Sequence, residues 1–268
     1  MTQASMPLVP VNHRPQATKG LILLPYAGGS PRSYQLLVKE LPEHVAAWGV
    51  CLPGRERRIS EQPFTDIMEV AREVAEASTD ICTAMPTVLF GHSMGGLCAY
   101  ETALLLQDAG TPAAGLAISS TAAPHSGLLP DATACLLNEA IRGLRSFNEL
   151  EPWESLGADQ AKYPLAPFFA DMSMLLRYER QAPSLVRLPI WASTGSDDPL
   201  VPPSALDPWK EVTRYEMSTR IHTGGHFYIE TAAQNSLRDF FGTLLAPASS
   251  EPPAGHGHHD SATDRDTL

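Results

Sequence analysis

Residues 88–96 read Val-Leu-Phe-Gly-His-Ser-Met-Gly-Gly, and this stretch indicates the fold more strongly than any other part of the chain. A short apolar run ends at Gly91, Ser93 follows, and a helix-forming segment begins after the next two glycines. The pattern is G-x-S-x-G in a strand–turn–helix setting, where a sharp turn lifts the serine hydroxyl clear of the sheet. Gly91 and Gly95 lack the Cβ atoms that would collide in so tight a turn. A glycine-rich packing turn without chemistry is the alternative interpretation, so the context has to decide.

Two later segments offer partners for this serine. Residues 188–201 read Leu-Pro-Ile-Trp-Ala-Ser-Thr-Gly-Ser-Asp-Asp-Pro-Leu-Val, so an apolar run ends in two carboxylates. Residues 221–229 read Ile-His-Thr-Gly-Gly-His-Phe-Tyr-Ile, which places a histidine after paired glycines. The chain order Ser, Asp, His is that of α/β-hydrolases. Because loops at the carboxyl ends of parallel strands gather at one edge of the sheet, these residues are expected to meet there.

The residue types suit nucleophilic catalysis. A serine hydroxyl needs a base within hydrogen-bond reach, a histidine supplies one near neutral pH, and a carboxylate orients that histidine. We therefore predict Ser93, Asp198 and His226 as the catalytic residues. Asp197 is the alternative acid, although an aspartate in a turn often has only a capping role. His222 competes with His226, but it lies inside a strand-like piece and is more typical of a structural residue.

Residues 21–30 read Leu-Ile-Leu-Leu-Pro-Tyr-Ala-Gly-Gly-Ser and predict a buried strand followed by a glycine-containing loop. Hydrolases with a G-x-S-x-G turn hold the oxyanion with an amide from such an early loop and the amide after the nucleophile. These amides belong here to Ala27 and Met94, with Tyr26 as the alternative early donor. A phosphate-binding loop is excluded, because the G-x-G-x-x-G spacing is absent and no Gly-Lys-Ser/Thr follows.

At residues 19–243 the chain resembles the type II thioesterases, stand-alone α/β-hydrolases of polyketide and nonribosomal peptide synthesis. The resemblance implies hydrolysis of acyl thioesters on the phosphopantetheine arm of an acyl or peptidyl carrier protein. It also implies Ser93, Asp198 and His226 as the triad. The matching segments are Leu24-Pro-Tyr-Ala-Gly-Gly-Ser30, Leu52-Pro-Gly-Arg-Glu-Arg-Arg58, Phe90-Gly-His-Ser-Met-Gly-Gly96, Gly195-Ser-Asp-Asp-Pro199 and Gly224-Gly-His-Phe-Tyr228.

Composition narrows the class of protein. The chain has 268 residues, 43% of them hydrophobic, which suits one α/β domain. The four cysteines form no C-x-x-C pair, and the first 20 residues lack the apolar core of a signal peptide, so a cytoplasmic protein is expected. No apolar stretch approaches the ~20 residues that span a bilayer. The net charge of −11 argues against nucleic acid as a partner.

The same negative charge bears on the expected protein partner. Carrier proteins are usually acidic, so two acidic surfaces would repel and docking would need a local basic patch. Arg55, Arg57 and Arg58 follow a predicted strand end and are the candidates for that patch. Ordinary solvated surface arginines are the alternative. We expect a monomer without cofactor or metal ion, and we interpret the tail histidines 256, 258 and 259 as part of a disordered segment.

The order of predicted elements is strand then helix, which indicates a mostly parallel central sheet flanked by helices, the α/β-hydrolase fold. Residues 1–18 are expected to be a flexible arm, 19–245 the hydrolase domain, and 246–268 a disordered tail. Residues 124–183 have a helical period with no strand and are predicted to form a lid over the serine. Strands are predicted near 20–25, 46–51, 87–91, 114–119, 188–194 and 217–222, and helices near 32–40, 66–84, 95–109, 204–211 and 227–243.

The apolar residues of the lid are candidates for contacts with an acyl group. We predict that Phe147, Phe168, Met172 and Leu176 bind substrate together with Tyr26, although packing of the lid onto the body is the alternative for each of them. A carboxylesterase, a lipase-like enzyme or an acyl-CoA hydrolase would use the same triad. A binding protein on a hydrolase fold is the non-enzymatic alternative. The first strand begins near residue 20, which favours a free-standing enzyme that edits carrier-bound chains, and release from a separate synthase stays open.

Overall fold

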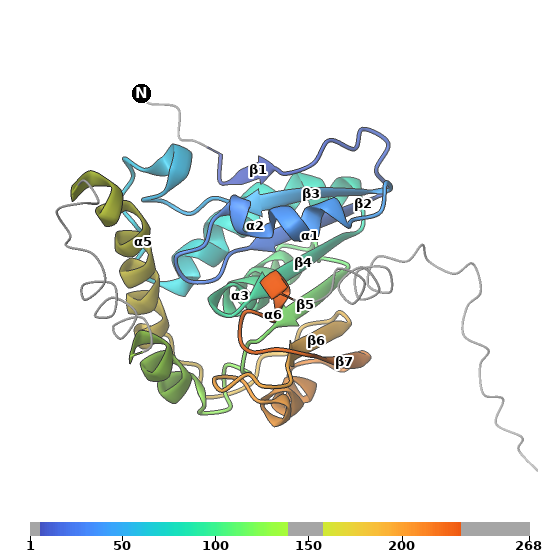
Figure 1. Cartoon of the computed structure of the whole chain (residues 1–268). Coiled ribbons are helices and arrows are strands. Elements are labelled where there is room, and N and C mark those ends of the chain that lie inside the picture. The colour runs from blue at the N-terminus through green and yellow to red at the C-terminus, as the bar shows by residue number, and fades with distance from the viewer. Residues whose placement is uncertain (1–5, 139–157, 232–268) are drawn as a thin grey trace, which may run out of the picture.

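The computed structural model describes residues 6–138 and 158–231. In this part of the chain seven strands form a single sheet with the order β1-β3-β2-β4-β5-β6-β7 (Figure 1). All neighbouring pairs are parallel except β1 and β3. The strands are β1 Leu8–Pro10, β2 Lys19–Leu24, β3 Val45–Val50, β4 Thr87–His92, β5 Gly115–Ser119, β6 Ile190–Gly195 and β7 Met217–His222.

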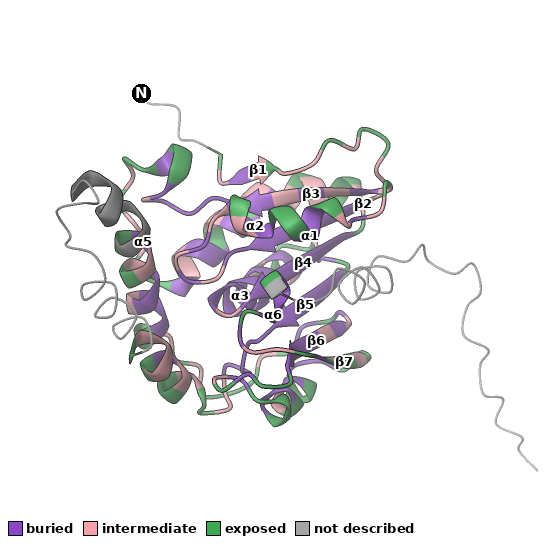
Figure 2. Ribbon diagram, viewed as in Figure 1, coloured by how far each residue is buried: buried purple, intermediate pink, exposed green. Residues whose placement is uncertain are grey.

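The central strands are apolar on both faces because helices cover both sides of the sheet. All residues of β4 and β5 are buried, as is every residue of β2 after the first (Figure 2). Consecutive strand residues point to opposite faces. Ile22 therefore packs in one core cluster with α2 (Ile67–Ala84) and α3 (Met94–Asp108). Leu23 packs in the other with α1 (Gln35–Lys39) and α6 (Tyr228–Thr231). This continuous burial is typical of a parallel sheet.

Helices α2 and α3, which pack on the same face of the sheet, differ in burial. Helix α2 begins after Asp66, whose side chain accepts a hydrogen bond from the Met68 amide at 2.9 Å, a favourable N-cap. Its buried residues recur at helical spacing and form one apolar stripe. Helix α3 is buried from Met94 to Ala103, which places it in the middle of the molecule. Its first turn therefore lies in the interior, directly after β4.

The strands and helices predicted from the sequence are confirmed to within two residues at most ends. Only α6 of the helix expected over 227–243 lies within the described residues, and 232–243 fall outside them together with the predicted tail 246–268. Helix α5 (Ala158–Arg177) and helical residues 129–138 belong to the segment expected as a lid. The remaining elements are 3-10 helices: η1 Pro31–Tyr34, η2 Glu56–Arg58 and the longer η3 Pro203–Val212.

The expected flexible arm over residues 1–18 is wrong for its middle section. Leu8–Pro10 forms β1, which pairs antiparallel with β3 in the register Leu8↔Val50. Leu8 is buried in the core cluster on the α2 side of the sheet. Proline interrupts the donors of a strand, and Pro10 is tolerated here because β1 is an edge strand. Proline-rich composition suggested an arm, whereas one buried leucine and an open edge of β3 are enough for a short strand.

Candidate active site

Ser93 lies in the turn between β4 and α3, in a backbone conformation that few residues adopt. Its φ and ψ are 54° and −121°. The Ser93 amide donates to the Ser119 carbonyl at 2.8 Å, and the Thr121 hydroxyl donates to the Ser93 carbonyl at 2.9 Å. A Cβ at Gly91 would lie 2.0 Å from the Gly95 carbonyl oxygen, so glycine is required there. Surrounding hydrogen bonds and glycines thus hold a strained turn, as is common at functional sites.

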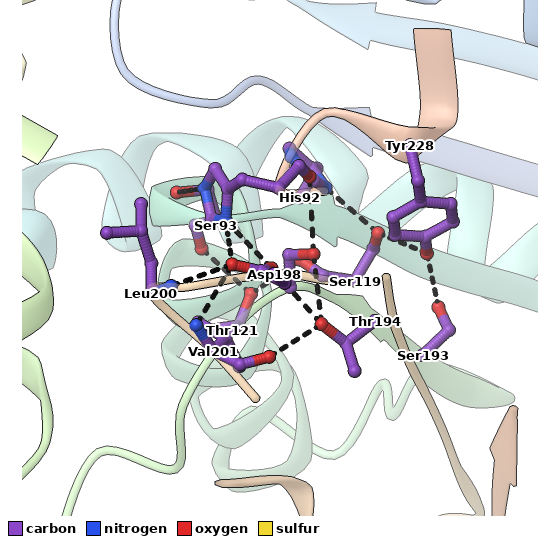
Figure 3. A network of polar contacts seen from close by, with 12 residues as sticks. His92, Ser93, Ser119, Thr121, Ser193, Thr194, Asp198, Leu200, Val201 and Tyr228 are labelled. Carbon is purple, nitrogen blue, oxygen red and sulfur yellow. Dashed lines mark hydrogen bonds and ion pairs between the residues drawn. The ribbon is translucent and has the colours of Figure 1, made fainter. Parts of the chain in front are cut away.

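The three predicted catalytic side chains lie in a hydrogen-bonded line. His226 Nε2 is 3.0 Å from Ser93 Oγ, and His226 Nδ1 is 3.0 and 3.2 Å from the two oxygens of Asp198. Asp198 follows β6, and His226 follows β7. Figure 3 shows Ser93 and Asp198 at the centre of a polar network that joins the ends of these strands. The imidazole is therefore placed to take the Ser93 proton through Nε2 while the carboxylate faces Nδ1.

Asp198 is surrounded by donors that favour its ionised form. Its Oδ1 accepts from the amides of Leu200 at 2.9 Å and Val201 at 3.0 Å, and its Oδ2 accepts from the Thr194 hydroxyl at 3.1 Å. Burial alone would raise the pKa of the carboxyl group. The hydrogen bond and charge of His226, together with the Val201 amide, outweigh burial and lower this pKa to about 2. Asp198 is thus a carboxylate at neutral pH, as an imidazole-orienting acid must be.

Asp197 and His222, the alternative acid and base, do not lie in the hydrogen-bonded line with Ser93. Asp197 is exposed, and its Oδ2 accepts a hydrogen bond from the Ser196 hydroxyl at 2.8 Å. His222 is buried near the end of β7, and its ring stacks on that of Tyr228 at 4.7 Å and 11°. Burial lowers the pKa of His222 to about 4, so this ring is neutral at neutral pH. Asp198 and His226 are therefore the pair that reaches Ser93.

The loop over residues 25–30, named here the oxyanion loop, lies against the first turn of α3. A Cβ at Gly95 would be only 2.1 Å from the Leu24 carbonyl oxygen, which shows how closely the two segments approach. Met94 is the first residue of α3, where amides have no acceptor within the helix. The Gly28 amide donates to Asp171 at 2.8 Å and is already used. Ala27 and Tyr26 stay as the candidate donors from this loop.

A pocket of about 380 Å³, counted with its open mouth, begins at Ser93 and His226. Its wall is mostly apolar and comes from α3, α5, the loop after β6 and helical residues 129–138. That last helix contributes positions separated by three and four residues, which form one face. An apolar chain attached to a carbonyl at Ser93 would therefore lie against an apolar wall. The lining residues are Ser93, Met94, Leu97, Ser120, Thr121, Ala122, Leu129, Ala132, Thr133, Leu136, Leu175, Leu200, Val201 and His226.

Comparison with known proteins agrees with this arrangement. The model of the thioesterase domain family matches residues 19–244. The chain belongs to the thioesterase family. Its sequence is 28% identical over 237 residues to the gramicidin S biosynthesis protein GrsT of Aneurinibacillus migulanus, and the match covers 85% of this chain and 90% of that protein.

Two solved structures that are similar to this thioesterase are themselves thioesterases of biosynthetic pathways. RedJ, a thioesterase of the prodiginine pathway in Streptomyces coelicolor, is 30% identical with a TM-score of 0.71, and the match covers 86% of this chain and 92% of RedJ. YbtT, a type II thioesterase of the yersiniabactin pathway, is 26% identical with a TM-score of 0.71, covering 89% and 96%. The α/β-hydrolase fold expected from the sequence is therefore shown.

The described residues among those predicted to bind substrate do not line the pocket at Ser93. Phe168 and Met172 lie on α5, Phe168 against Gly28 and Met172 in the core, and neither lines the pocket. Leu176 is 57% exposed, whereas its neighbour Leu175 lines the pocket, because one residue turns a helix by about 100°. Leu176 therefore does not line this pocket, and its contact with substrate stays a prediction. Phe147 lies outside the described residues.

Tyr26, the fifth predicted substrate residue, does not line the pocket described here. Its hydroxyl donates to Glu230 Oε1 at 2.6 Å, and its ring packs edge-on against His92 and Phe227 at 5.7 and 5.2 Å. Phe227 is 38% exposed. Tyr26 thus joins the oxyanion loop to the segment that carries the catalytic histidine candidate.

The basic patch expected at residues 55–58 is wrong. Arg55 and Arg58 are 5% and 4% exposed, and each is paired with buried or half-buried carboxylates. Arg58 binds Glu73 and Glu61 with contacts of 2.6 Å, and Arg57 donates to the Leu8 carbonyl at 3.2 Å. These arginines tie the loop after β3 to α2, β1 and α5. Arg55 and Arg58 therefore do not present a positive surface to an acidic partner, and Arg57 is the exposed residue of the three.

His92 is a site residue that the sequence argument passed over. It ends β4, is fully buried, and its ring centroid lies 5.1 Å from that of His226. Its Nδ1 is 2.9 Å from the Ser119 hydroxyl, which is 2.6 Å from the Tyr228 hydroxyl (Figure 3). Burial and the nearby His226 lower the pKa of His92 well below its ordinary value. A neutral ring beside His226 adds no charge that would oppose formation of an imidazolium. The sequence could have indicated this role, because His92 directly precedes Ser93 at the end of a mostly apolar strand.

The described residues place two further limits on the site. No helix among residues 6–138 and 158–231 is long and apolar enough to cross a membrane. Within the same ranges, no group of three or more His, Cys, Asp and Glu side chains is arranged to hold a metal ion.

Proposed function

We propose that the protein is a type II thioesterase that hydrolyses acyl thioesters on the phosphopantetheine arm of carrier proteins. One observation carries the proposal: His226 bridges Ser93 and Asp198 with contacts of 3.0 Å, in a chain whose residues 19–244 match the thioesterase domain. GrsT and YbtT, both named for peptide or polyketide pathways, support a carrier-bound substrate.

The first half-reaction transfers the acyl group to the enzyme. His226 Nε2 takes the Ser93 proton as Oγ attacks the thioester carbonyl, and the carbonyl oxygen becomes an oxyanion. The amides of Met94 and Ala27 would donate to that oxygen. Collapse of the tetrahedral intermediate breaks the C–S bond, and His226 returns the proton to the departing thiol. Asp198, ionised with a pKa of about 2, stabilises the imidazolium in between.

The second half-reaction releases the acid. Water replaces the thiol, His226 removes its proton, and a second oxyanion forms at the same amides. Collapse of this intermediate returns the proton to Ser93 Oγ and frees the carboxylic acid. The apolar wall of the pocket supports an apolar acyl group as substrate, since the hydroxyls of Thr121 and Thr133 within it already donate to backbone carbonyls. We further propose that the enzyme edits stalled carriers in the cytoplasm and acts as a monomer.

Mass spectrometry of a panel of acyl-loaded carrier proteins tests this proposal. Wild-type enzyme is expected to remove apolar acyl groups from the phosphopantetheine arm, and Ser93→Ala to lower turnover by about 10⁴-fold or more. Acyl-CoA and p-nitrophenyl esters are assayed in parallel. Rapid turnover of the ester with no deacylation of any carrier would show that the protein is a carboxylesterase instead.

A further inference from the structure

Helix α5 and the oxyanion loop are joined by charged groups inside the molecule. Asp171 of α5 is 1% exposed, and its two oxygens receive Arg55 in a bidentate ion pair at 2.7 and 2.8 Å. Asp171 Oδ2 also accepts from the Gly28 amide at 2.8 Å. Arg55 in turn donates to the Gly29 carbonyl at 2.8 Å. Two successive residues of the loop are thus hydrogen-bonded to one buried ion pair.

The bond to Gly28 fixes a peptide plane beside a proposed oxyanion donor. The peptide that carries the Gly28 N–H also contains the Ala27 carbonyl, and a peptide is planar. Its orientation therefore sets ψ of Ala27 and φ of Gly28, which is +79°. Only the two dihedral angles of Ala27 separate this plane from the Ala27 N–H. Gly28 also packs closely against α5 one helical turn before Asp171, because a Cβ at Gly28 would lie 3.1 Å from Phe168 Cβ.

We propose that Asp171 is a positioning residue for the hydrolysis: it holds the oxyanion loop through the Gly28 amide so that the Ala27 amide faces the oxyanion. The inference rests on the proposed function, because it assigns Asp171 a part in that reaction. Asp171 does not line the pocket. Its removal should consequently change transition-state stabilisation and leave ground-state binding of the acyl chain nearly unchanged.

A double substitution separates this role from a structural one. Arg55→Met with Asp171→Leu replaces both charges by apolar side chains of similar size, which often preserves stability when a buried pair is removed as a whole. The Gly28 amide then loses its acceptor. With p-nitrophenyl hexanoate as substrate, we expect kcat to fall about 10- to 100-fold, with KM changed by less than about threefold and with a melting temperature near that of wild type.

A second measurement reports the oxyanion directly. An acyl trifluoromethyl ketone forms a tetrahedral adduct with the serine, so its inhibition constant should rise by the same factor by which kcat/KM falls. Asp171→Asn keeps an oxygen that accepts from Gly28, although a neutral acceptor binds more weakly than a carboxylate. Its kcat should lie between those of wild type and the double variant.

The chain offers a matched control in the pair of Glu101 and Arg180. Glu101 of α3 is 1% exposed and binds Arg180 at 2.6 and 2.8 Å, and the other hydrogen bonds of the two side chains go to Tyr178 and Ser184. Glu101→Leu with Arg180→Met is expected to keep kcat within about twofold, since the oxyanion donors are untouched.

The outcomes are distinct. Wild-type kcat in a folded Arg55→Met, Asp171→Leu enzyme would overturn the inference, as would an equal fall in kcat for the Glu101 and Arg180 control. If the double variant does not fold, Asp171→Asn decides, and wild-type kcat together with an unchanged ketone inhibition constant would overturn the inference. The proposed function fails separately, when Ser93→Ala keeps its activity or when no carrier thioester is cleaved by wild-type enzyme.

Discussion

Substitution of Gly95 by alanine sets two physical effects against each other. Alanine stabilises a helix by up to about 1 kcal/mol relative to glycine, and Gly95 is the second residue of α3. The new Cβ would nevertheless lie 2.1 Å from the Leu24 carbonyl oxygen and 2.8 Å from that of Pro25. Both oxygens are backbone atoms, so no side-chain rotation relieves the overlap. Overpacking of this kind costs about 1–3 kcal/mol, which exceeds the gain in helix propensity.

The effect on catalysis follows from the size of the overlap. An ordinary carbon–oxygen contact is more than 3 Å, so the start of the oxyanion loop must retreat by about 1 Å. A misplacement of about 1 Å lowers turnover by about 10²-fold, and complete loss of one oxyanion donor lowers it by about 10²–10³-fold. We therefore expect Gly95→Ala to lower kcat by about 10²-fold and to leave KM nearly unchanged.

The assay is steady-state hydrolysis of a p-nitrophenyl ester beside a thermal melt, with Gly110→Ala as control. Gly110 lies just beyond the end of α3 with φ +77° and no atoms within 4 Å of an added Cβ. Alanine there costs about 1 kcal/mol of backbone strain without a clash, so stability falls while kcat is retained. A folded Gly95→Ala enzyme whose kcat is within twofold of wild type would refute the reasoning about the loop.

Three other predictions concern the pocket and the response of stability to acid. Leu175→Ala should change the ratio of kcat/KM between short and long acyl thioesters by about 10-fold or more, because Leu175 lines the pocket, while Leu176→Ala should leave the ratio unchanged. A chain-length series that both variants leave unaltered would contradict this assignment. The pKa of His92 is lowered in the folded protein and returns to its ordinary value of 6.5 on unfolding. Below pH 6.5 the unfolded state therefore binds a proton that the folded state does not, and the free energy of unfolding should decrease as the pH falls. In His92→Gln this part of the pH dependence should disappear from the melting curves, and an unchanged dependence would argue against it. Asp198, with a pKa of about 2 against 3.8, should add a further loss as pH falls from about 4 to 2.

The arrangement of Ser93, Asp198 and His226 was predictable because each residue follows a parallel strand, and topology brings such ends together. The frame Gly195-x-x-Asp198, followed by Pro199-Leu-Val201, favours Asp198 over Asp197, and the structure gives the reason. Asp198 is reached by the Leu200 and Val201 amides of the same turn, whereas Asp197 points to solvent.

Other features depend on partners that are distant in sequence. Arg55 and Arg58 resembled surface charges because Asp171 and Glu73 lie 116 and 15 residues away and showed no local relation to them. The choice between Leu175 and Leu176 required the exact rotation of α5, and periodicity alone leaves that rotation uncertain by about one residue. The burial of these arginines and the rotation of α5 both depend on tertiary contacts, which a single sequence does not display.

The Arg55–Asp171 pair also bears on how this enzyme is re-engineered. Its cation comes from the loop after β3 and its anion from α5, so an ion pair connects α5, which contributes Leu175 to the pocket, to the body of the protein. A helix transplanted from a homologue in place of α5 brings its own residue at the position of Asp171 and leaves Arg55 of the recipient without its partner. Chimeras designed only to alter selectivity would then bury an unmatched cation next to the loop over residues 25–30, and both halves of the pair must be exchanged together.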